Sequence, residues 1–232
     1  MGKRIISRAR GAGGPRYRSP EHRYVGSVSY PKFTEGQMKA EVMEIVHDPG
    51  KSAPLARLKF TDGIEKYVTA TEGMKKGDII VFGATGRNNV AKLSEIQEGV
   101  PICSIELLPF SGPKICRSSG VYGTVITKGE KVTVKMSSGK IKEFNPNCLA
   151  MIGIPAGGGR VDKLFVKAGQ VYHAKLARNK LWPRSSASKM NPVDHPFGGK
   201  TKPGWPKTVS RWAPPGQKVG AISSRRTGLR KK

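Results

Sequence analysis

Asp194 and His195 are side chains whose types could support acid–base chemistry. A histidine that is oriented by a carboxylate can act as a general base. However, a carboxylate adjacent in sequence seldom has that geometry, and no Ser or Cys nucleophile is recognisable by motif. The pair also lies in a loop rich in proline and glycine, Met190 to Gly199. We therefore predict that His195 contacts RNA by hydrogen bonding or stacking, with general-base catalysis as the alternative.

Two glycine-rich segments, 11–14 and 157–159, could present backbone amides to a phosphate. Both lack the Lys-Ser/Thr pair of a nucleotide-binding loop, and the first also lacks a preceding strand, which disfavours a nucleotide site. A flexible turn is the simpler alternative. We favour close approach of the main chain to an RNA backbone, because glycine has no side chain and arginines flank both segments. These arginines are Arg8, Arg10, Arg16 and Arg160.

Histidines and cysteines are the residue types that bind zinc, but their spacing here gives no support for a metal site. No two of them have the separation of two to five residues that a preorganised tetrahedral site needs. The spacing also fits neither a CxxC motif nor a disulfide framework, so we expect reduced thiols, no metal and no cofactor. The residues are His22, His47, His173, His195, Cys103, Cys116 and Cys148.

The three tryptophans, Trp182, Trp205 and Trp212, lie in the basic C-terminal part of the chain, each beside Pro, Arg or both. Aromatic and guanidinium planes that alternate in an irregular chain suit stacking on RNA bases. The alternative is that these rings anchor the tail onto the folded part of the protein.

The composition points to a polyanionic partner. The 232 residues include 42 Lys and Arg but only 16 Asp and Glu, which gives a net charge of +26. Such a charge repels itself unless a polyanion neutralises it, and nucleic acid is the commonest such partner, with an acidic membrane surface as the alternative. No run of eighteen apolar residues and no secretory signal is present, so we expect a cytoplasmic protein with no membrane partner.

The charge is distributed unevenly along the chain. Net charge is +7 in residues 1–32, −1 in 33–101, +5 in 102–160 and +15 in 161–232. The nearly neutral segment has the clearest strand patterns, whereas both ends are basic and rich in Gly and Pro. Because residues 183–232 cannot bury enough apolar surface to offset the entropy of ordering, we expect this tail to be disordered in isolation.

The middle of the chain predicts two small antiparallel barrels. Strands are expected at 40–46, 56–60, 64–69 and 79–82, with Asp62-Gly63 as a hairpin turn. A second set is expected at 102–108, 121–127, 132–136, 141–144 and 149–154. Short helices or turns are expected only at 90–97 and 172–180. The predicted fold class is therefore mainly β, with two small barrels between basic extended arms.

Several short motifs, in order along nearly the whole chain, resemble the family of universal large-subunit ribosomal protein two, in its archaeal and eukaryotic form. The Asn-Pro-Val-Asp-His-Pro-Phe-Gly-Gly run at 191–199 is close to diagnostic. The other motifs are His47 to Gly50, Ala53 to Ala56, Glu72-Gly73-Met74, Ala156 to Arg160, Lys167 to Gly169, Tyr172-His173, Trp182-Pro183 and Arg226-Thr227-Gly228.

The resemblance implies an oligonucleotide-binding-fold barrel followed by an SH3-like barrel and an extension that threads into ribosomal RNA. We expect a basic arm at 1–34, the first barrel at 35–86, the second at 87–165 and the extension at 166–232. The resemblance also implies that the protein is a non-enzymatic structural component of the large ribosomal subunit and a primary binder of ribosomal RNA. Subunit association, tRNA binding and the architecture of the peptidyl transferase centre are its implied roles.

The implied partners are large-subunit ribosomal RNA, neighbouring ribosomal proteins and the small subunit at an intersubunit bridge. Asn191, Asp194 and His195 are expected near the peptidyl transferase centre. A free RNA chaperone or a chromosomal DNA binder is a further alternative. We expect RNA contacts from Arg8, Arg10, Arg16, Arg18, Arg160, Lys167, Tyr172, His173, Arg178, Trp182, Arg184, Asn191, His195, Arg211, Arg225 and Arg226.

Overall fold

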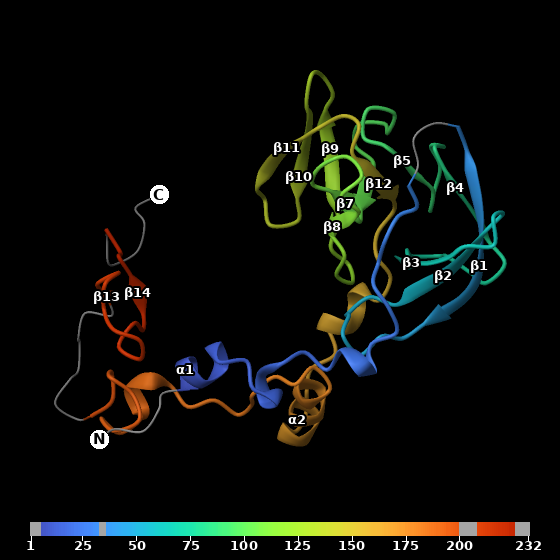
Figure 1. The fold of residues 1–232 in the computed structure, drawn as a ribbon. Coiled ribbons are helices and arrows are strands. Elements are labelled where there is room, and N and C mark those ends of the chain that lie inside the picture. The colour runs from blue at the N-terminus through green and yellow to red at the C-terminus, as the bar shows by residue number, and fades with distance from the viewer. Residues whose placement is uncertain (1–5, 33–35, 200–207, 226–232) are drawn as a thin grey trace. The chain divides into compact units, whose positions relative to one another are not determined.

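The computed structural model describes residues 6–32, 36–199 and 208–225 (Figure 1). The chain forms two compact units. Unit 1 combines the two ends of the chain, Met1–Glu21 and Val166–Lys232, and unit 2 is the continuous segment His22–Phe165. The residues between the ends thus fold on their own contacts, as the strand patterns of the middle predict.

Four strands form the first barrel of unit 2: β1 (Met38–Val46), β2 (Leu55–Phe60), β3 (Glu65–Thr69) and β4 (Ile79–Phe82). In β2 the residues at alternate positions 58 and 60 are buried and Lys59 between them is exposed, as a period of two requires. Gly63 has a positive φ of 76° in the turn between β2 and β3, where its N–H donates to the Phe60 carbonyl at 2.9 Å. The sequence-predicted hairpin is confirmed.

The second barrel contains shorter strands. Ile102 to Leu108 was expected as one strand, but it is interrupted at Ser104, whose φ is 50°, because a residue in the left-handed region breaks the pleat. The strands are β5 (Val90–Lys92), β6 (Pro101–Cys103), β7 (Ile105–Glu106), β8 (Pro113–Ile115), β9 (Gly123–Thr127), β10 (Val132–Met136), β11 (Ile141–Phe144) and β12 (Leu149–Ile152).

One continuous sheet joins the two barrels. Ten strands are hydrogen-bonded in the order β11-β10-β9-β6-β12-β5-β4-β1-β2-β3, and β7 pairs separately with β8. The link is a parallel pairing of β4 with β5 through Phe82 and Val90. The expectation of a helix or turn at 90–97 is therefore wrong for its first residues, which are recruited into the sheet. The mainly β fold class with two small barrels is confirmed.

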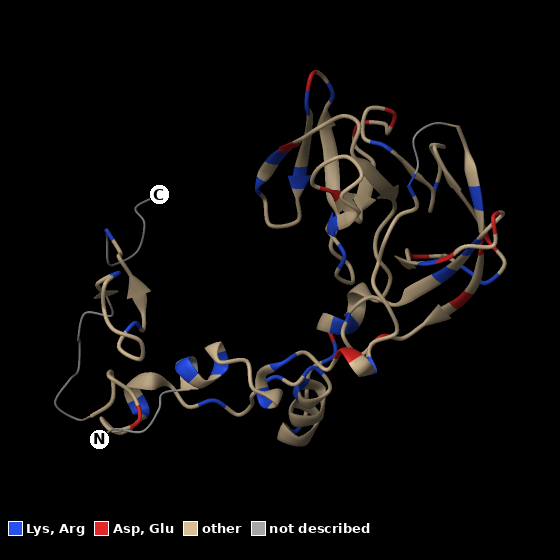
Figure 2. Cartoon of the chain, viewed as in Figure 1, with Lys and Arg blue, Asp and Glu red and all other residues tan. Residues whose placement is uncertain are grey.

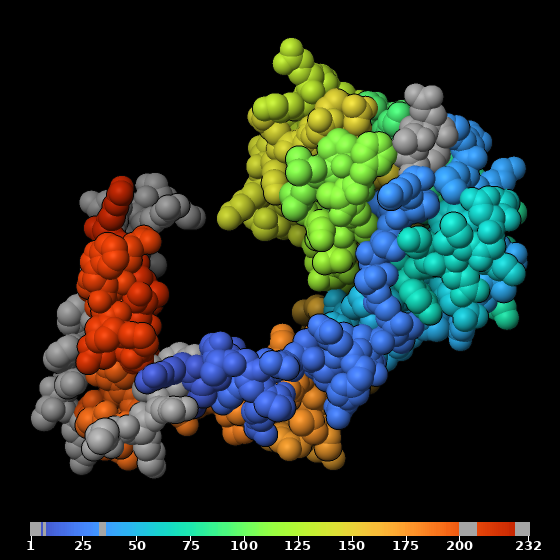
Figure 3. Space-filling view, in the orientation of Figure 1, coloured from blue at the N-terminus to red at the C-terminus, as the bar shows by residue number. Residues whose placement is uncertain are grey.

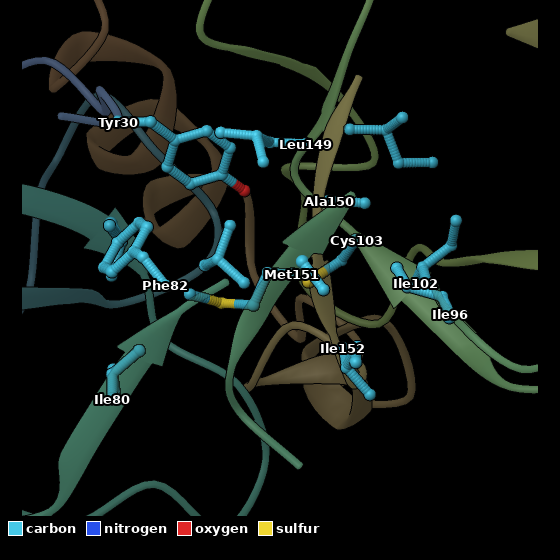
Figure 4. Packing of buried hydrophobic residues seen from close by; sticks show 14 of the residues in the cluster. Tyr30, Ile80, Phe82, Ile96, Ile102, Cys103, Leu149, Ala150, Met151 and Ile152 are labelled. Carbon is cyan, nitrogen blue, oxygen red and sulfur yellow. The ribbon is translucent and has the colours of Figure 1, made fainter. Parts of the chain in front are cut away.

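The barrels also share one hydrophobic core. Tyr30 packs edge-on against Phe82 at 5.9 Å between ring centroids, and the Met151 side chain of β12 points toward Phe82 of β4 (Figure 4). The Tyr30 hydroxyl donates to the Ser104 carbonyl at 2.7 Å. Burial raises the pKa of Tyr30 well above its ordinary value, so the phenol remains a donor at all physiological pH values. The segment before β1 is thus fixed to both barrels.

The three cysteines belong to this core and form no disulfide. Cys103, Cys116 and Cys148 are all buried as free thiols. Burial raises the pKa of Cys103 to about 12 and that of Cys116 and Cys148 to about 11. They therefore behave as small apolar side chains and not as reactive thiolates, which agrees with the predicted reduced state.

Unit 1 is built differently, from short helices and little buried surface. Among its described residues, only Pro20, Gly198 and Val219 are buried. Its elements are α1 (Ile6–Gly11), η1 (Pro15–Tyr17), α2 (Ala168–Leu176), η4 (Ala187–Lys189), β13 (Thr208–Val209) and β14 (Ala221–Ile222). Two further short helices are η2 (Glu21–Arg23), which spans the boundary between the units, and η3 (Gly158–Val161) in unit 2. The helix α2 confirms part of the helical expectation at 172–180.

A buried carboxylate organises the loop between β7 and β8. The Glu106 side chain is 1% exposed, and it accepts hydrogen bonds from the backbone N–H groups of Gly112 at 2.8 Å, Leu149 at 3.0 Å and Phe110 at 3.3 Å. Phe110 and Gly112 both have positive φ values, of 64° and 73°. A single carboxylate therefore holds a tight loop against strand β12.

We predict that Glu106→Ala lowers the free energy of unfolding by about 3 kcal/mol or more, because several buried N–H groups lose their acceptor. Glu106→Gln should cost less, because the amide keeps the volume and one acceptor oxygen. Urea unfolding of the full chain, followed by the near-ultraviolet circular dichroism of its tyrosines, measures both losses. Glu143→Ala is the matched control, because Glu143 is largely exposed and forms a surface ion pair with Lys131 at 3.3 Å. Equal losses for Glu106→Ala and the control would contradict the assignment.

Candidate nucleic-acid interface

The positive charge of the chain is concentrated in unit 1. Unit 1 contains 22 Lys and Arg and two acids, whereas unit 2 contains 20 and 14. Figure 2 shows the basic residues of unit 1 along α1, η1 and the segment after α2, while acidic and basic residues alternate over the strands of unit 2. Unit 1 therefore has an excess of cations that its own acids cannot neutralise.

Six of these cations surround one hollow of about 500 Å³ in unit 1, which we term the cationic hollow. No carboxylate lines it. Because like charges at such short range repel one another, the arrangement favours a bound anion. The lining residues are Arg10, Tyr17, Arg18, Ser19, Lys175, Arg178, Asn179, Lys180, Leu181, Trp182 and Arg184.

Asn179 holds the two walls of the cationic hollow together. Its side-chain amide donates to the carbonyl of Pro15 at 2.9 Å and to that of Arg18 at 2.8 Å. Asn179 has a φ of 50°, which asparagine tolerates better than most residues and which ends α2. Figure 3 shows the N-terminal segment lying against the segment that contains α2. One side chain thus fixes residues distant in sequence within the same unit.

The glycine segment 11–14 supports this arrangement as a turn. The Nε atom of Arg18 donates to the Gly13 carbonyl at 2.7 Å, and Gly13 has a φ of 68°. The Gly13 N–H donates to the Arg10 carbonyl at 3.1 Å, so this amide is used inside the protein. The glycines therefore shape the loop that carries Arg10 and Arg18, whereas their approach to an RNA backbone stays a prediction.

Aromatic side chains contribute to the same hollow. Tyr17 and Trp182 are both half-buried, and both line it beside the guanidinium groups. Trp212 is 89% exposed, so it does not anchor the chain to a core within its unit. Trp205 lies outside the described residues. Flat aromatic faces among cations suit a nucleotide, because a base can stack while its phosphate is neutralised.

The loop Met190 to Gly199 is closed by its own backbone. The Gly199 N–H donates to the Met190 carbonyl at 3.2 Å, and the N–H groups of Asp194 and His195 share the Asn191 carbonyl. A side chain at Gly198 would put its Cβ 2.4 Å from the Asn191 oxygen, so only glycine fits there. The diagnostic run of residues is thus a compact turn.

His195 is held in one tautomer within this loop. Its Nδ1 atom accepts the Phe197 N–H at 3.1 Å, and its ring lies 5.1 Å from the Phe197 ring. Burial lowers the pKa of His195, so the imidazole is neutral at physiological pH. Because Nδ1 is an acceptor, the single ring proton lies on Nε2. His195 therefore presents a hydrogen-bond donor from Nε2.

The structure brings five of the predicted RNA-contact residues into the cationic hollow: Arg10, Arg18, Arg178, Trp182 and Arg184. Tyr172 and His173 lie on α2, where their rings make an edge contact at 5.5 Å, and Lys167 precedes that helix. Arg160 belongs to unit 2 and donates to the Ser119 hydroxyl at 2.5 Å. Arg8, Arg16, Asn191, Arg211 and Arg225 are exposed elsewhere in unit 1, and Arg226 lies outside the described residues.

Sequence reasoning missed six residues of the hollow, which are Tyr17, Ser19, Lys175, Asn179, Lys180 and Leu181. Lys175 lies three residues before Arg178, and this helical spacing could have placed both on one face. Tyr17 stands between Arg16 and Arg18, and this alternation of aromatic and arginine residues is the same signal that the tryptophans give. The double hydrogen bond of Asn179 has no signal in the sequence, because it joins segments far apart in the chain.

The part of the chain that the structure describes contains neither a metal centre nor a membrane-spanning helix. No group of three or more His, Cys, Asp or Glu side chains there could hold a metal ion. No helix within the described residues is both long and apolar enough to cross a membrane.

Comparison with known proteins gives full-length similarity to ribosomal L2 proteins. Residues 3–82 match the family "Ribosomal Proteins L2, RNA binding N-terminal domain", and residues 86–218 match "Ribosomal Proteins L2, C-terminal domain". The chain is 48% identical over 237 residues to "Large ribosomal subunit protein uL2" of Archaeoglobus fulgidus, covering 100% of both chains. It is also 48% identical to that of Methanococcoides burtonii, with 99% and 100% covered, and 46% identical to that of Methanothermobacter thermautotrophicus, with 100% of both covered.

These matches agree with the two joined barrels of unit 2, the cationic unit 1 and the closed turn at residues 190–199. They extend across both units, so the resemblance inferred from the motifs does not rest on one shared domain. The chain belongs to the ribosomal L2 family.

Proposed function

We propose that this protein is a structural, non-enzymatic component of the large ribosomal subunit and that it binds ribosomal RNA directly through unit 1. The observation that carries the proposal is the cationic hollow, where six Lys and Arg side chains converge with two aromatic rings and no acid. A polyanion that also offers planar bases fits this chemistry, and single-stranded or looped RNA provides both. The relatives named as large-subunit proteins support the ribosomal setting.

Binding would follow from charge neutralisation and shape. Each Lys or Arg that contacts a phosphate releases condensed counterions, which supplies affinity without reading sequence. Tyr17 and Trp182 add stacking, and the small buried surface of unit 1 lets the chain follow irregular RNA. Unit 2, with its continuous sheet and shared core, serves as the rigid base.

Finer roles belong to the same proposal. We propose that the arm (1–34), the two barrels (35–86 and 87–165) and the extension (166–232) act as separate functional parts. We also propose contacts with neighbouring ribosomal proteins and with the small subunit at an intersubunit bridge. We further propose that the protein acts in the cytoplasm. There it supports tRNA binding, subunit association and the architecture of the peptidyl transferase centre. RNA contacts are assigned to the sixteen residues named from the sequence, with Tyr17, Lys175 and Lys180 added from the hollow.

General-base catalysis by His195 is the alternative, and the tautomer of this residue weighs against it. A general base needs an unprotonated nitrogen directed at the proton that it removes. In His195 the unprotonated Nδ1 is already occupied by the Phe197 N–H at 3.1 Å. The remaining nitrogen carries a proton and can only donate. We therefore assign His195 a positioning role, as a donor to an acceptor atom of RNA.

Sedimentation tests the ribosomal assignment. We predict that the chain co-migrates in fixed ratio with the large subunit when native extract is separated on a sucrose gradient in moderate salt. It should also survive a salt wash that removes loosely bound basic proteins, because many of its phosphate contacts form together. Mass spectrometry across the fractions gives the ratio. Sedimentation as free protein or with DNA would instead favour an RNA chaperone or a chromosomal DNA binder.

Two substitutions separate the shape of the hollow from its charge. Asn179→Ala should weaken binding of the full chain to a large-subunit rRNA fragment by about tenfold, because the cations lose their fixed spacing, with the salt dependence nearly unchanged. Arg184→Gln should lower the slope of log K against log salt by about 0.7, because one phosphate contact to an unpaired strand is lost. Filter binding at several KCl concentrations measures both. Asn147→Ala, on an exposed asparagine of unit 2, is the control and should change neither value.

Donation by His195 predicts that glutamine replaces it better than alanine. Subunits that carry His195→Gln should assemble and transfer peptide near the normal rate in single-turnover assays, because the glutamine amide still donates. His195→Ala should impair assembly of the subunit. If His195 were a general base, His195→Gln would assemble normally yet lose about a hundredfold in rate. Val193→Ala, on an exposed side chain of the same loop, is the matched control.

A further inference from the structure

A second hollow, in unit 2, has the opposite chemistry from the first. It has a volume of about 720 Å³, and we term it the acidic hollow. Segments 72, 85–87, 95–101 and 152–154 meet there, beside the junction of β4, β5, β6 and β12. Its lining residues are Glu72, Thr85, Gly86, Arg87, Glu95, Ile96, Gln97, Val100, Pro101, Ile152, Gly153 and Ile154.

Backbone hydrogen bonds fix the walls of the acidic hollow. The N–H of Asn88 donates to the Ile152 carbonyl at 2.9 Å, that of Gly153 to Pro101 at 2.9 Å, and that of Glu72 to Ile154 at 2.8 Å. The bond from Asn88 holds the β4–β5 connection to the end of β12. The other two bonds hold the start of β6 and the chain at Glu72 to the residues that follow β12. Because these elements belong to the continuous sheet, the hollow is formed before any ligand arrives.

The motif Glu72-Gly73-Met74, which the RNA interface does not use, builds one edge of this hollow. The Arg87 guanidinium donates to the Glu72 carbonyl at 3.0 Å and lies over Gly73. A Cβ at Gly73 would come within 2.8 Å of the Arg87 Nη2 atom, and Gly73 also has a φ of 80°. Glycine is therefore needed here for Arg87 to lie flat along the rim, where its charge is directed to a backbone carbonyl.

The floor of the acidic hollow is apolar and its rim is acidic. Ile96 and Ile152 come from the shared core and are 0% and 9% exposed, and both are visible at the end of the cluster in Figure 4. The carboxylates of Glu72 and Glu95 are on exposed residues of the rim. The two carboxylates outnumber the single guanidinium of Arg87, so the lining has a net negative charge that disfavours phosphate. It suits a cationic side chain whose aliphatic part covers isoleucine.

The charge of the whole chain supports the same conclusion. Residues 33–101, which supply most of the lining, carry −1 within a chain of +26. The volume accommodates a few side chains of an extended peptide, but not a helix with its full diameter. We propose that the acidic hollow binds an extended Lys- or Arg-containing segment of a neighbouring protein in the same particle. The inference rests on the proposed function for its setting, because the partner is a protein of the large subunit.

A photo-cross-link from inside the hollow tests the inference. Gln97, an exposed lining residue, is replaced by p-benzoylphenylalanine in the full chain, and large subunits that contain the variant are purified and irradiated. Mass spectrometry then identifies the attached peptide. We expect one defined segment of another ribosomal protein, with Lys or Arg within a few residues of the attachment point. The same probe at Lys59, an exposed residue of β2, shows the background.

Charge reversal then tests whether recognition depends on the acids. A synthetic peptide of the cross-linked segment should bind the full chain, with Kd weakened at least tenfold by Glu95→Lys and weakened further as salt rises. Glu130→Lys, on an exposed acid that does not line the hollow, should leave Kd unchanged.

Four outcomes would overturn the inference. They are cross-linking to RNA, cross-linking to a segment without basic residues, equal effects of the two charge reversals, and absence of any adduct from Gln97 in subunits that contain the variant. The last outcome would leave the proposed function intact, because the variant is present in the subunits. If the variant and the unmodified chain both fail to sediment with the large subunit, the proposed function fails as well, so the two failures are distinguishable.

Discussion

The uncompensated positive charge of unit 1 is the constraint on which the rest of the molecule depends. With 22 basic residues against two acids, this unit cannot neutralise its charge with ion pairs of its own, and it buries almost no apolar surface among its described residues. What order it has comes from directed hydrogen bonds, above all the double donation of Asn179 and the bond from Arg18 to the Gly13 carbonyl. A bound anion would neutralise the excess positive charge of such a unit.

Unit 2 is built in the opposite way, because a buried apolar core stabilises it. Its ten-stranded sheet and single core make the two barrels one folding unit, and the joint depends on few contacts. Phe82 illustrates this, since it pairs with Val90 across the joint and packs against Tyr30 and Phe60. Unit 2 also contains a buried carboxylate, Asp48, that is stabilised by hydrogen bonds. Burial raises the pKa of this carboxyl, but hydrogen bonds from Lys51 and Gly50 outweigh the effect of burial, so the pKa is lowered overall.

The sequence predicts those features of the fold that depend on local pattern. Strands such as 132–136 and 141–144 were located because alternation and turn residues are local signals. Features that depend on long-range contacts were not predicted. Residues 90–92 become a strand only because β4 and β12 flank them, and Ser104 breaks a strand because Tyr30 and Cys116 anchor its backbone. At the interface the individual arginines were found from composition, but their convergence on one hollow required the fold.

The two hollows show how one chain can serve two kinds of partner. If the acids of residues 33–101 were spread over unit 1, they would weaken every phosphate contact there. Unit 2 would also lose the acidic surface that repels phosphate. Segregation avoids both effects, because a face that repels phosphate is left accessible to protein when RNA covers the cationic face. The barrel junction is a suitable place for that face, since the contacts that hold the two barrels together also hold Glu72 and Arg87 at fixed positions on its rim. The constraint from which we infer that unit 1 binds RNA therefore also explains why the acids lie where they do.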